Sequence, residues 1–180
     1  GVVGAGRIGF TTIRCLSGFG PKKIYAYDPF PNPKVEEYAS FVSLGELYAQ
    51  CDVIIYHAIY NESSHHMVNR ESIQTMKDGV VLVNVSRGEL MDVDALVEGI
   101  ESEKIGALAM DVFPEEDGIY HVSRTHDILA NRNMAYLRQF PNVILTQHIA
   151  FYTDIDVDSM VEQGIRGILA MATGECATEL

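Results

Sequence analysis

Three glycines near the start of the chain constrain its fold more than any other feature. Gly4, Gly6 and Gly9 follow the apolar pair Val2–Val3 and lead into an amphipathic segment that begins at Arg7. Glycine allows tight turns and close backbone approaches that a side chain would block. The spacing therefore predicts a strand and a helix joined by a tight turn. Gly4 makes that turn, Gly6 leaves room beside the backbone, and Gly9 lets the helix pack closely on the strand.

Apolar, β-branched runs alternate with amphipathic segments along the rest of the chain. The predicted strands are Val2–Val3, Ile24–Tyr27, Phe41–Val42, Val53–Tyr56, Val80–Val85, Ala107–Val112 and Val143–Thr146. The predicted helices are Arg7–Phe19, Leu44–Gln50, Arg70–Met76, Val93–Ile100, Asp127–Arg138 and Asp156–Thr173. Continuous apolar strands separated by helices are typical of an α/β fold, a doubly wound parallel sheet. The long polar connection Pro114–Pro141 interrupts this rhythm.

The composition excludes several classes of function. The 180 residues carry 13 Lys and Arg against 25 Asp and Glu, a formal charge of −12, which argues against a nucleic-acid partner. Apolar runs such as Val80–Val85 are too short to cross a bilayer. Cys15, Cys51 and Cys176 form neither a disulfide framework nor a redox or zinc pair, so we expect a reducing cytoplasm. Because the chain begins inside a strand, we expect a piece of a longer protein.

An acidic residue stands in register with the glycines. Asp28 ends the second predicted strand, nineteen residues after Gly9. A pyrophosphate would lie at the N-terminus of the first helix, where unpaired N–H groups favour negative charge. A carboxylate after the second strand accepts ribose hydroxyls and repels a 2′-phosphate, which favours NAD over NADP. The alternative is a structural glycine turn with an incidental aspartate.

Titratable side chains follow three later strands. Arg87 comes after Val80–Val85, Asp111 and Glu116 lie at and beyond the end of the next strand, and His148 follows the last. Parallel strands end at one edge of a sheet, where ligands of α/β proteins gather. An arginine can clamp a carboxylate, a histidine can protonate a developing alkoxide, and a glutamate can keep that histidine charged. Spacing alone leaves open that each residue is an ordinary surface or structural group.

Longer motifs identify a family. The stretches GVVGAGRIG, AYDPFP, VVLVNVSRGELMDVDALVEGI, AMDVFPEE and NVILTQHIAFYT together resemble the D-isomer-specific 2-hydroxyacid dehydrogenases over nearly the whole chain. The resemblance implies that Arg87 binds substrate, that Glu116 rather than Glu115 is the partner carboxylate, and that His148 is the acid/base. It also implies a set of residues that contact NAD: Arg7 and Ile8 at the pyrophosphate, Asp28 at the ribose, Asp111 near the nicotinamide, and Ala58, Ile59, Val85 and Ser86 along the cleft.

The segment after His148 indicates a branch of the family. His-Ile-Ala-Phe-Tyr-Thr resembles the D-lactate and D-2-hydroxyisocaproate dehydrogenases, which act on small 2-oxo acids such as pyruvate. Phe151 would then contact an uncharged substrate side chain, although packing under the last helix remains open. The sequence departs from the family at Gln147 and Ile59, where proline is frequent.

The resemblance also divides the chain. It implies an NAD-binding domain over residues 1–150 and a segment 151–180 that belongs to or docks on the substrate domain, its helix returning toward a part of that domain not contained in this sequence. It further implies a homodimer. No histidine or cysteine cluster has metal-ligand spacing, so no metal is expected. His57 either borders the adenine or packs structurally. Two other functions stay open: an NAD-sensing corepressor-like binding protein, and a cofactor domain that is inactive by itself.

Overall fold

A computed structural model describes residues 1–123 and 131–174 of the chain. It consists of two compact units, Gly1–Gln147 and His148–Leu180. Residues 127–130 of the predicted fifth helix lie outside the described residues, as do His126 and Cys176. Among the described residues, no helix combines the length and apolar character needed to span a bilayer.

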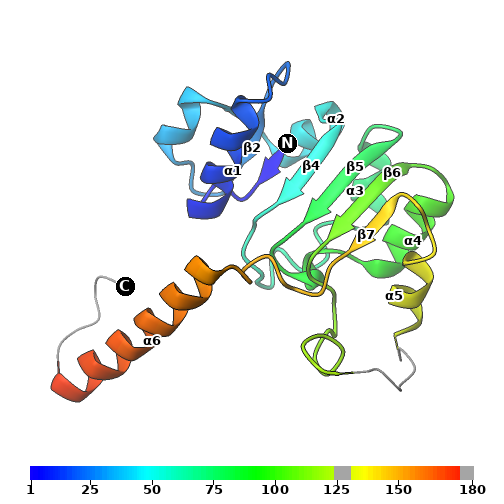
Figure 1. Cartoon of the computed structure of the whole chain (residues 1–180). Coiled ribbons are helices and arrows are strands. Elements are labelled where there is room, and N and C mark those ends of the chain that lie inside the picture. Colours follow the sequence, from blue (N-terminus) through cyan, green and yellow to red (C-terminus); the bar gives the residue numbers. More distant parts are fainter. Residues whose placement is uncertain (124–130, 175–180) are drawn as a thin grey trace. The chain divides into compact units, whose positions relative to one another are not determined.

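In the described part of the first unit, seven strands form one parallel sheet in the order β3-β2-β1-β4-β5-β6-β7 (Figure 1). The strands are β1 (Val2–Val3), β2 (Tyr25–Tyr27), β3 (Ser40–Phe41), β4 (Val53–Tyr56), β5 (Val80–Asn84), β6 (Ile105–Met110) and β7 (Val143–Leu145). Each predicted strand is present, with ends that differ by at most two residues. The predicted doubly wound sheet is therefore confirmed.

The strand order reverses its direction beside β1. Val2 pairs with Ala26 of β2 on one side and with Ile55 of β4 on the other. In a sheet of this kind the loops after the central strands diverge and leave a crevice at the carboxyl edge, which is where ligands bind. The glycine turn after β1 opens onto this position.

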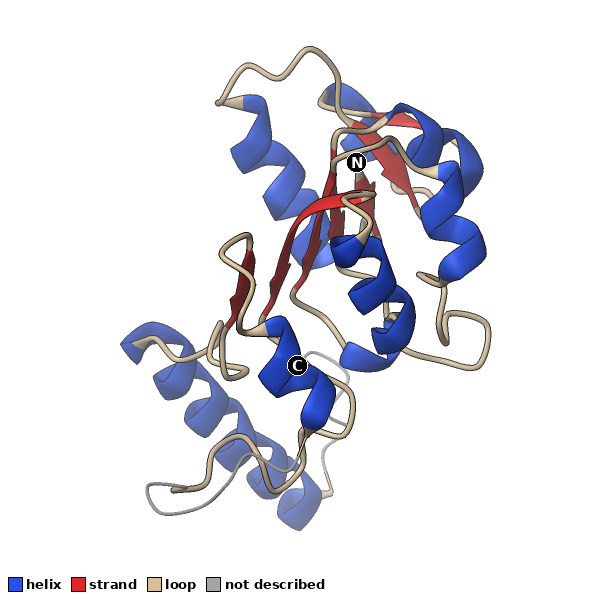
Figure 2. Ribbon diagram, turned by 90° about the vertical axis from the view of Figure 1, so that its right-hand side faces the viewer, coloured by secondary structure: helices blue, strands red, loops and turns tan. Residues whose placement is uncertain are grey.

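Helices cover both faces of the sheet (Figure 2). In the first unit they are α1 (Arg7–Ser17), α2 (Leu44–Gln50), α3 (Arg70–Thr75), α4 (Val93–Glu101) and α5 (Arg132–Leu137), with 3₁₀ turns at Pro33–Glu37 and Gly88–Leu90. Side chains cap three of these helices where the sequence predicts a cap. Ser43 accepts the N–H of Glu46, Asn69 that of Ser72, and Asp92 that of Ala95.

Successive residues of β1 point into two different cores. Val2 packs with Ile13 of α1 and Ala26 of β2 in a small cluster. Val3 joins a larger cluster that contains Ile54, Leu82 and residues of α2, α3, α4 and α5. Alternation of this kind follows from the two-residue period of a strand. Because both faces are apolar and covered, this part of the sheet gives a rigid base for the loops at its carboxyl edge.

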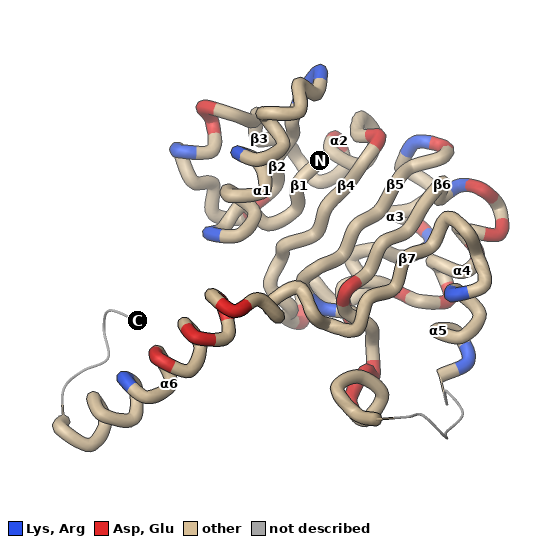
Figure 3. Tube along the Cα trace, in the orientation of Figure 1, with Lys and Arg blue, Asp and Glu red and all other residues tan. Residues whose placement is uncertain are grey.

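The second unit is mainly α6 (Asp154–Thr173). Thr153 caps it by accepting the N–H of Asp156, so the helix begins at Asp154, two residues before the predicted start at Asp156. Gly174 ends it with φ of +72°, as predicted. Acidic residues are concentrated in its first half (Figure 3), and Arg166 forms an ion pair with Glu162 one turn earlier.

Candidate active site

The glycine turn joins β1, β4 and α1 at distances that exclude side chains. Gly4 has φ of +91°, and a Cβ there would lie 2.5 Å from the backbone nitrogen of Ala58. A Cβ on Gly9 would overlap the carbonyl oxygen of Gly4. Any larger residue at these positions would separate the helix from the strands. The structure thus supports the packing roles that the sequence predicts for these two glycines.

The N-terminus of α1 is open toward this turn. Gly6 is the N-cap residue and has no side chain to cap the helix, and the first helical bond runs from the Phe10 N–H to the Gly6 carbonyl at 2.9 Å. The N–H groups of Arg7 and Ile8 therefore precede the helical ladder. A Cβ on Gly6 would meet nothing within 4 Å, so the space beside it can take a diphosphate. These features fit a dinucleotide.

Asp28 connects the end of β2 to the same turn. One carboxylate oxygen accepts the Ala5 N–H at 2.8 Å, and the other accepts the Phe30 N–H at 2.8 Å. An ionised carboxylate offers about four lone-pair directions, so these two bonds leave capacity for the two hydroxyls of a ribose. Asp28 both fixes the turn and keeps a negative charge beside it.

The end of β4 contributes His57, Ala58 and Ile59. The Nε2 of His57 lies 2.9 Å from the Thr12 hydroxyl on α1, and burial lowers the pKa of its imidazole. A neutral imidazole therefore connects β4 to α1. Ile59 is 78% exposed, as a residue that lines an open cleft would be. Contact of Ala58 and Ile59 with the cofactor stays a prediction.

Arg87 lies on the turn after β5. Its side chain is exposed, and its Nη1 donates to the carbonyl of Ser86 at 2.6 Å. Val85, before Ser86, is 37% exposed. The turn thus presents a guanidinium and a partly exposed valine at the carboxyl edge. Contact of Arg87 with substrate and of Val85 and Ser86 with the cofactor stays a prediction.

Asn84 is a residue of this turn that the sequence analysis missed. It is the last residue of β5 and has no exposed surface. Its side chain donates to the carbonyl of Arg87 at 2.8 Å and accepts the N–H of Ser86 at 3.1 Å. An uncharged polar residue within an apolar strand was the available signal, since a buried carboxamide needs partners.

Asp111 lies directly after β6 and is 5% exposed. Its carboxylate accepts the hydroxyl of Thr146 at 2.5 Å, and its N–H donates to the carbonyl of Asn84 at 3.0 Å. The ends of β5, β6 and β7 are therefore joined at one point of the carboxyl edge. A buried carboxylate held in this way can also accept an amide N–H, such as that of a nicotinamide carboxamide.

Glu116 closes the turn after β6. Its carboxylate accepts the N–H of Phe113 at 2.7 Å, whereas the neighbouring Glu115 is exposed and has φ of +57°. Burial raises the pKa of the nearby Tyr120 hydroxyl, and the negative charge of Glu116 raises it further. Glu116 is thus fixed by the turn, and its role as the partner carboxylate of the histidine stays a prediction.

His148 and Phe151 belong to the second unit, separate from the other predicted catalytic residues. His148 has φ of +53°, and its ring packs edge-on against that of Phe151 with centroids 6.3 Å apart. The Phe151 ring in turn packs edge-on against that of Tyr152, with centroids 6.1 Å apart. The structure thus brings together the turns of Arg87, Asp111 and Glu116. A meeting of His148 with them stays a prediction.

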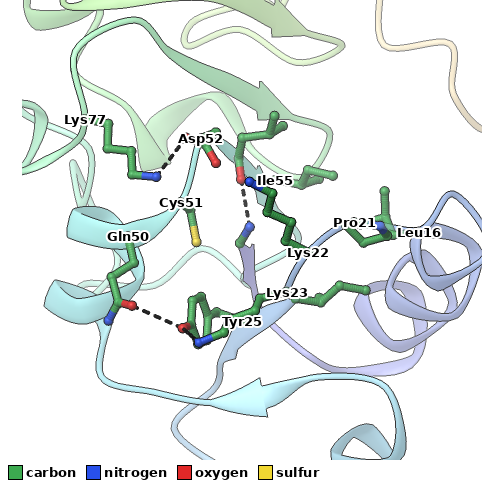
Figure 4. A pocket seen from close by; sticks show the side chains of 13 residues that line it. Leu16, Pro21, Lys22, Lys23, Tyr25, Gln50, Cys51, Asp52, Ile55 and Lys77 are labelled. Carbon is green, nitrogen blue, oxygen red and sulfur yellow. Dashed lines mark hydrogen bonds and ion pairs between the residues drawn. The ribbon is translucent and has the colours of Figure 1, made fainter.

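A cavity of about 780 Å³ lies at the opposite edge of the sheet, around the amino ends of β1, β2 and β4 (Figure 4). It is lined by Lys22, Lys23, Tyr25 and Cys51 among others, and Lys77 there pairs with Asp52 at 2.8 Å. No residue of the predicted site lines it. Among the described residues, no group of three or more metal-ligating side chains has suitable geometry for an ion.

The family follows from a direct match. Residues 1–150 match the model of the D-isomer specific 2-hydroxyacid dehydrogenase, NAD binding domain. The chain belongs to this family. The NAD-binding domain expected from the glycine motif and Asp28 is therefore confirmed, and the Rossmann-type sheet is the fold of that domain.

Individual family members share about half of their length with this chain. An aromatic 2-oxoacid reductase from Clostridium sporogenes is 45% identical over 162 residues, which are 90% of this chain and 49% of the relative. A D-lactate dehydrogenase from Lactobacillus delbrueckii subsp. bulgaricus is 43% identical over 176 residues, 97% of this chain and 53% of the relative. The chain therefore spans about half the length of these curated relatives.

Solved structures of the family superimpose closely. A D-lactate dehydrogenase from Treponema pallidum gives a TM-score of 0.93 at 34% identity, covering 99% of this chain and 54% of that chain. A D-lactate dehydrogenase with NAD⁺ from Lactobacillus jensenii gives a TM-score of 0.90 at 30% identity, covering 98% of this chain and 53% of that chain. The predicted resemblance to the D-lactate dehydrogenases is thus confirmed.

Proposed function

We propose that this protein reduces a small 2-oxo acid to the D-2-hydroxy acid with NADH, and catalyses the reverse reaction with NAD. The observation that carries the proposal is the pairing of two turns. The turn with the exposed guanidinium of Arg87 packs against the turn that Glu116 closes, because Gly88 lies directly on the backbone of Phe113 and Pro114. A substrate-binding cation and a carboxylate thus share one edge of an NAD-binding domain.

Each side chain has a role that its chemistry supports. Arg87 holds the substrate carboxylate in a bidentate grip and polarises the adjacent carbonyl. His148 donates a proton to the carbonyl oxygen and accepts it in the reverse direction. Glu116 favours the charged imidazole by its negative charge. Bound NADH supplies the hydride.

Chain connectivity supports the assignment of His148. Thr146 is fixed to Asp111 at the carboxyl edge, and two residues of chain span at most about 7 Å. The backbone at His148 therefore lies within about 7 Å of Thr146, and we propose that its imidazole meets Arg87 and Glu116. We assign residues 1–150 to the cofactor domain and 151–180 to a segment that docks on a substrate domain.

The substrate that we propose is pyruvate. Phe151 and Tyr152 form an aromatic pair after His148 that suits an uncharged side chain. Similarity to a D-lactate dehydrogenase favours pyruvate, whereas similarity to an aromatic 2-oxoacid reductase favours phenylpyruvate as the second candidate. We further propose a homodimer that works in the cytoplasm.

A substrate panel tests this function. The intact protein is assayed with NADH and with NADPH against pyruvate, 2-oxoisocaproate and phenylpyruvate, and the product is analysed on a chiral column. We expect NADH-dependent formation of the D-isomer, with pyruvate preferred. A preference for phenylpyruvate would transfer the assignment to the second candidate. No turnover with any of the three acids would contradict the enzyme itself and favour an NAD-sensing binding protein.

A further inference from the structure

Asn84 closes the turn that carries Arg87 with one buried side chain. The carboxamide nitrogen donates to the Arg87 carbonyl at 2.8 Å, and the carboxamide oxygen accepts the Ser86 N–H at 3.1 Å and lies 3.3 Å from the Ser86 hydroxyl. The side chain has no exposed surface. A buried carboxamide with both ends bonded holds its partners in one geometry, because breaking either bond leaves an unsatisfied polar group.

The turn that carries Arg87 packs tightly against the turn that carries Glu116. A Cβ on Gly88 would overlap the carbonyl carbon of Phe113 and the nitrogen of Pro114. Phe113 in turn donates its N–H to the Glu116 carboxylate at 2.7 Å. The position of Asn84 therefore sets the position of the Arg87 backbone relative to Glu116.

We propose that Asn84 is a positioning residue for the substrate carboxylate, acting through Arg87. The Arg87 side chain is exposed, so the surrounding side chains give it little packing, and the backbone turn decides its direction. When the Asn84 bonds are lost, the turn relaxes and the guanidinium leaves the position in which both of its nitrogens meet a carboxylate. This inference rests on the proposed function, because it assigns Arg87 to substrate.

Asn142, the residue directly before β7, provides a matched control. Its carboxamide also donates to a backbone carbonyl at 2.8 Å, that of Gly106. Gly106 lies at the amino end of β6, away from the Arg87 turn. Asn142→Ala therefore removes the same kind of bond without touching the carboxyl edge.

The test uses the intact protein and two independent readouts. Asn84→Ala, Asn84→Asp and Asn142→Ala are compared with wild type for binding of oxamate, an unreactive 2-oxo acid analogue, to the NADH complex, and for kcat and KM with pyruvate. We expect Asn84→Ala to weaken oxamate binding and to lower kcat/KM by up to about 100-fold, the loss that an ångström-scale misplacement can cause. NADH affinity is measured in parallel, because Asn84 also bonds Ser86, which is predicted to contact NAD. We expect NADH binding to weaken less than oxamate binding, since the glycine turn and Asp28 are unchanged. Asn142→Ala should change only the melting temperature.

A double-mutant cycle separates positioning from general stability. If Asn84 acts through Arg87, then Asn84→Ala should change the residual kcat/KM of an Arg87→Ala protein by less than about twofold. If Asn84 had a merely structural role, Asn84→Ala would lower kcat/KM by the same factor in the wild-type and in the Arg87→Ala protein. If Asn84→Ala fails to fold, Asn84→Asp provides a second test. Protonation of its carboxyl group restores a hydrogen-bond donor to the Arg87 carbonyl. Its kcat/KM relative to wild type should rise as the pH falls.

The outcomes distinguish this inference from the proposed function. Turnover by wild type that is lost in Arg87→Ala but unchanged in Asn84→Ala would overturn the role of Asn84 alone. A flat pH dependence of the Asn84→Asp ratio would also overturn it. Wild type that reduces none of the three acids would overturn the proposed function and this inference together.

Discussion

The carboxylate of Asp28 accepts the backbone N–H of Ala5 at 2.8 Å, which ties the end of β2 to the middle of the glycine turn. Residues 23 positions apart thus form one rigid corner. The other oxygen is held by Phe30, so the carboxylate cannot rotate freely. A fixed negative charge at this corner discriminates between dinucleotides with and without a 2′-phosphate.

Replacement of Asp28 tests this discrimination. Asp28→Ala removes the repulsion of a 2′-phosphate and the acceptor of the ribose hydroxyls, so we expect the ratio of NADPH to NADH dissociation constants to fall by at least about tenfold. Fluorescence titration with both dinucleotides measures the ratio. Glu46→Ala is the control, because Glu46 also accepts a backbone N–H, that of Ser43, but lies on α2. An unchanged ratio in Asp28→Ala would refute the ribose assignment.

Gly6 and Gly45, where an added Cβ would meet no other atom within 4 Å, give a test of the diphosphate site. Gly6 has φ of −67°, which alanine adopts easily, and its Cβ would meet nothing within 4 Å. Gly6→Ala should lower the melting temperature only slightly, as expected for alanine at an N-cap. It should weaken NADH binding by about tenfold or more, because the methyl group occupies the space of the diphosphate.

Gly45→Ala is the matched control, since its Cβ also meets nothing within 4 Å but lies in α2. It should stabilise the protein by about 0.5–1 kcal/mol and leave NADH binding unchanged. Equal NADH affinity in Gly6→Ala and wild type would place the diphosphate elsewhere. Gly9→Ala differs from both, because its methyl group overlaps the Gly4 carbonyl, and should lose stability and binding together.

The buried imidazole of His57 predicts a loss of stability in mild acid. Burial lowers its folded-state pKa below the ordinary value of 6.5. Between these two pKa values the unfolded chain binds more protons than the folded one, so the free energy of unfolding rises with pH. This contribution is present above pH 6.5 and is lost as the pH falls through the folded-state pKa.

Melting temperatures between pH 7.5 and 5.5 check this contribution. We expect wild type to lose more stability than His57→Asn over this range, because asparagine does not titrate. Thr12→Ser keeps a hydroxyl near the Nε2 of His57 and should retain the wild-type slope. The lowered pKa values of Asp52, Asp78 and Glu98 act at more acidic pH and do not confuse the comparison. A slope in His57→Asn equal to that of wild type would contradict the assignment.

Local chemistry made much of the fold readable from the sequence. The caps at Ser43, Asn69 and Asp92 are set by side chains that bond the N–H groups of the next few residues, so a short sequence window contains the whole interaction. Gly4 and Asp28 were readable because a βαβ unit places them at a fixed sequence separation. The parallel, doubly wound sheet was readable from the alternation of strands and helices, whereas the order of its strands was not predicted.

Contacts between distant segments were not readable in the same way. Gly88 is required because the chain at Phe113 and Pro114 returns to touch it, and nothing local shows this. Asn84 was overlooked because its neighbours are apolar and its partners lie on a turn that the strand pattern does not define. The 3₁₀ turn Gly88–Leu90 was missed for the same reason. Strand ends shifted by one or two residues because pairing, not hydrophobicity, decides where a strand stops.

The most direct measurement concerns His148. In the intact protein, His148→Gln removes the proton donor but leaves the glycine turn and Asp28 untouched. We predict that NADH oxidation with pyruvate falls by about 10²–10⁴-fold, while the dissociation constant of NADH stays within about twofold. Turnover close to that of wild type would contradict the proposed mechanism.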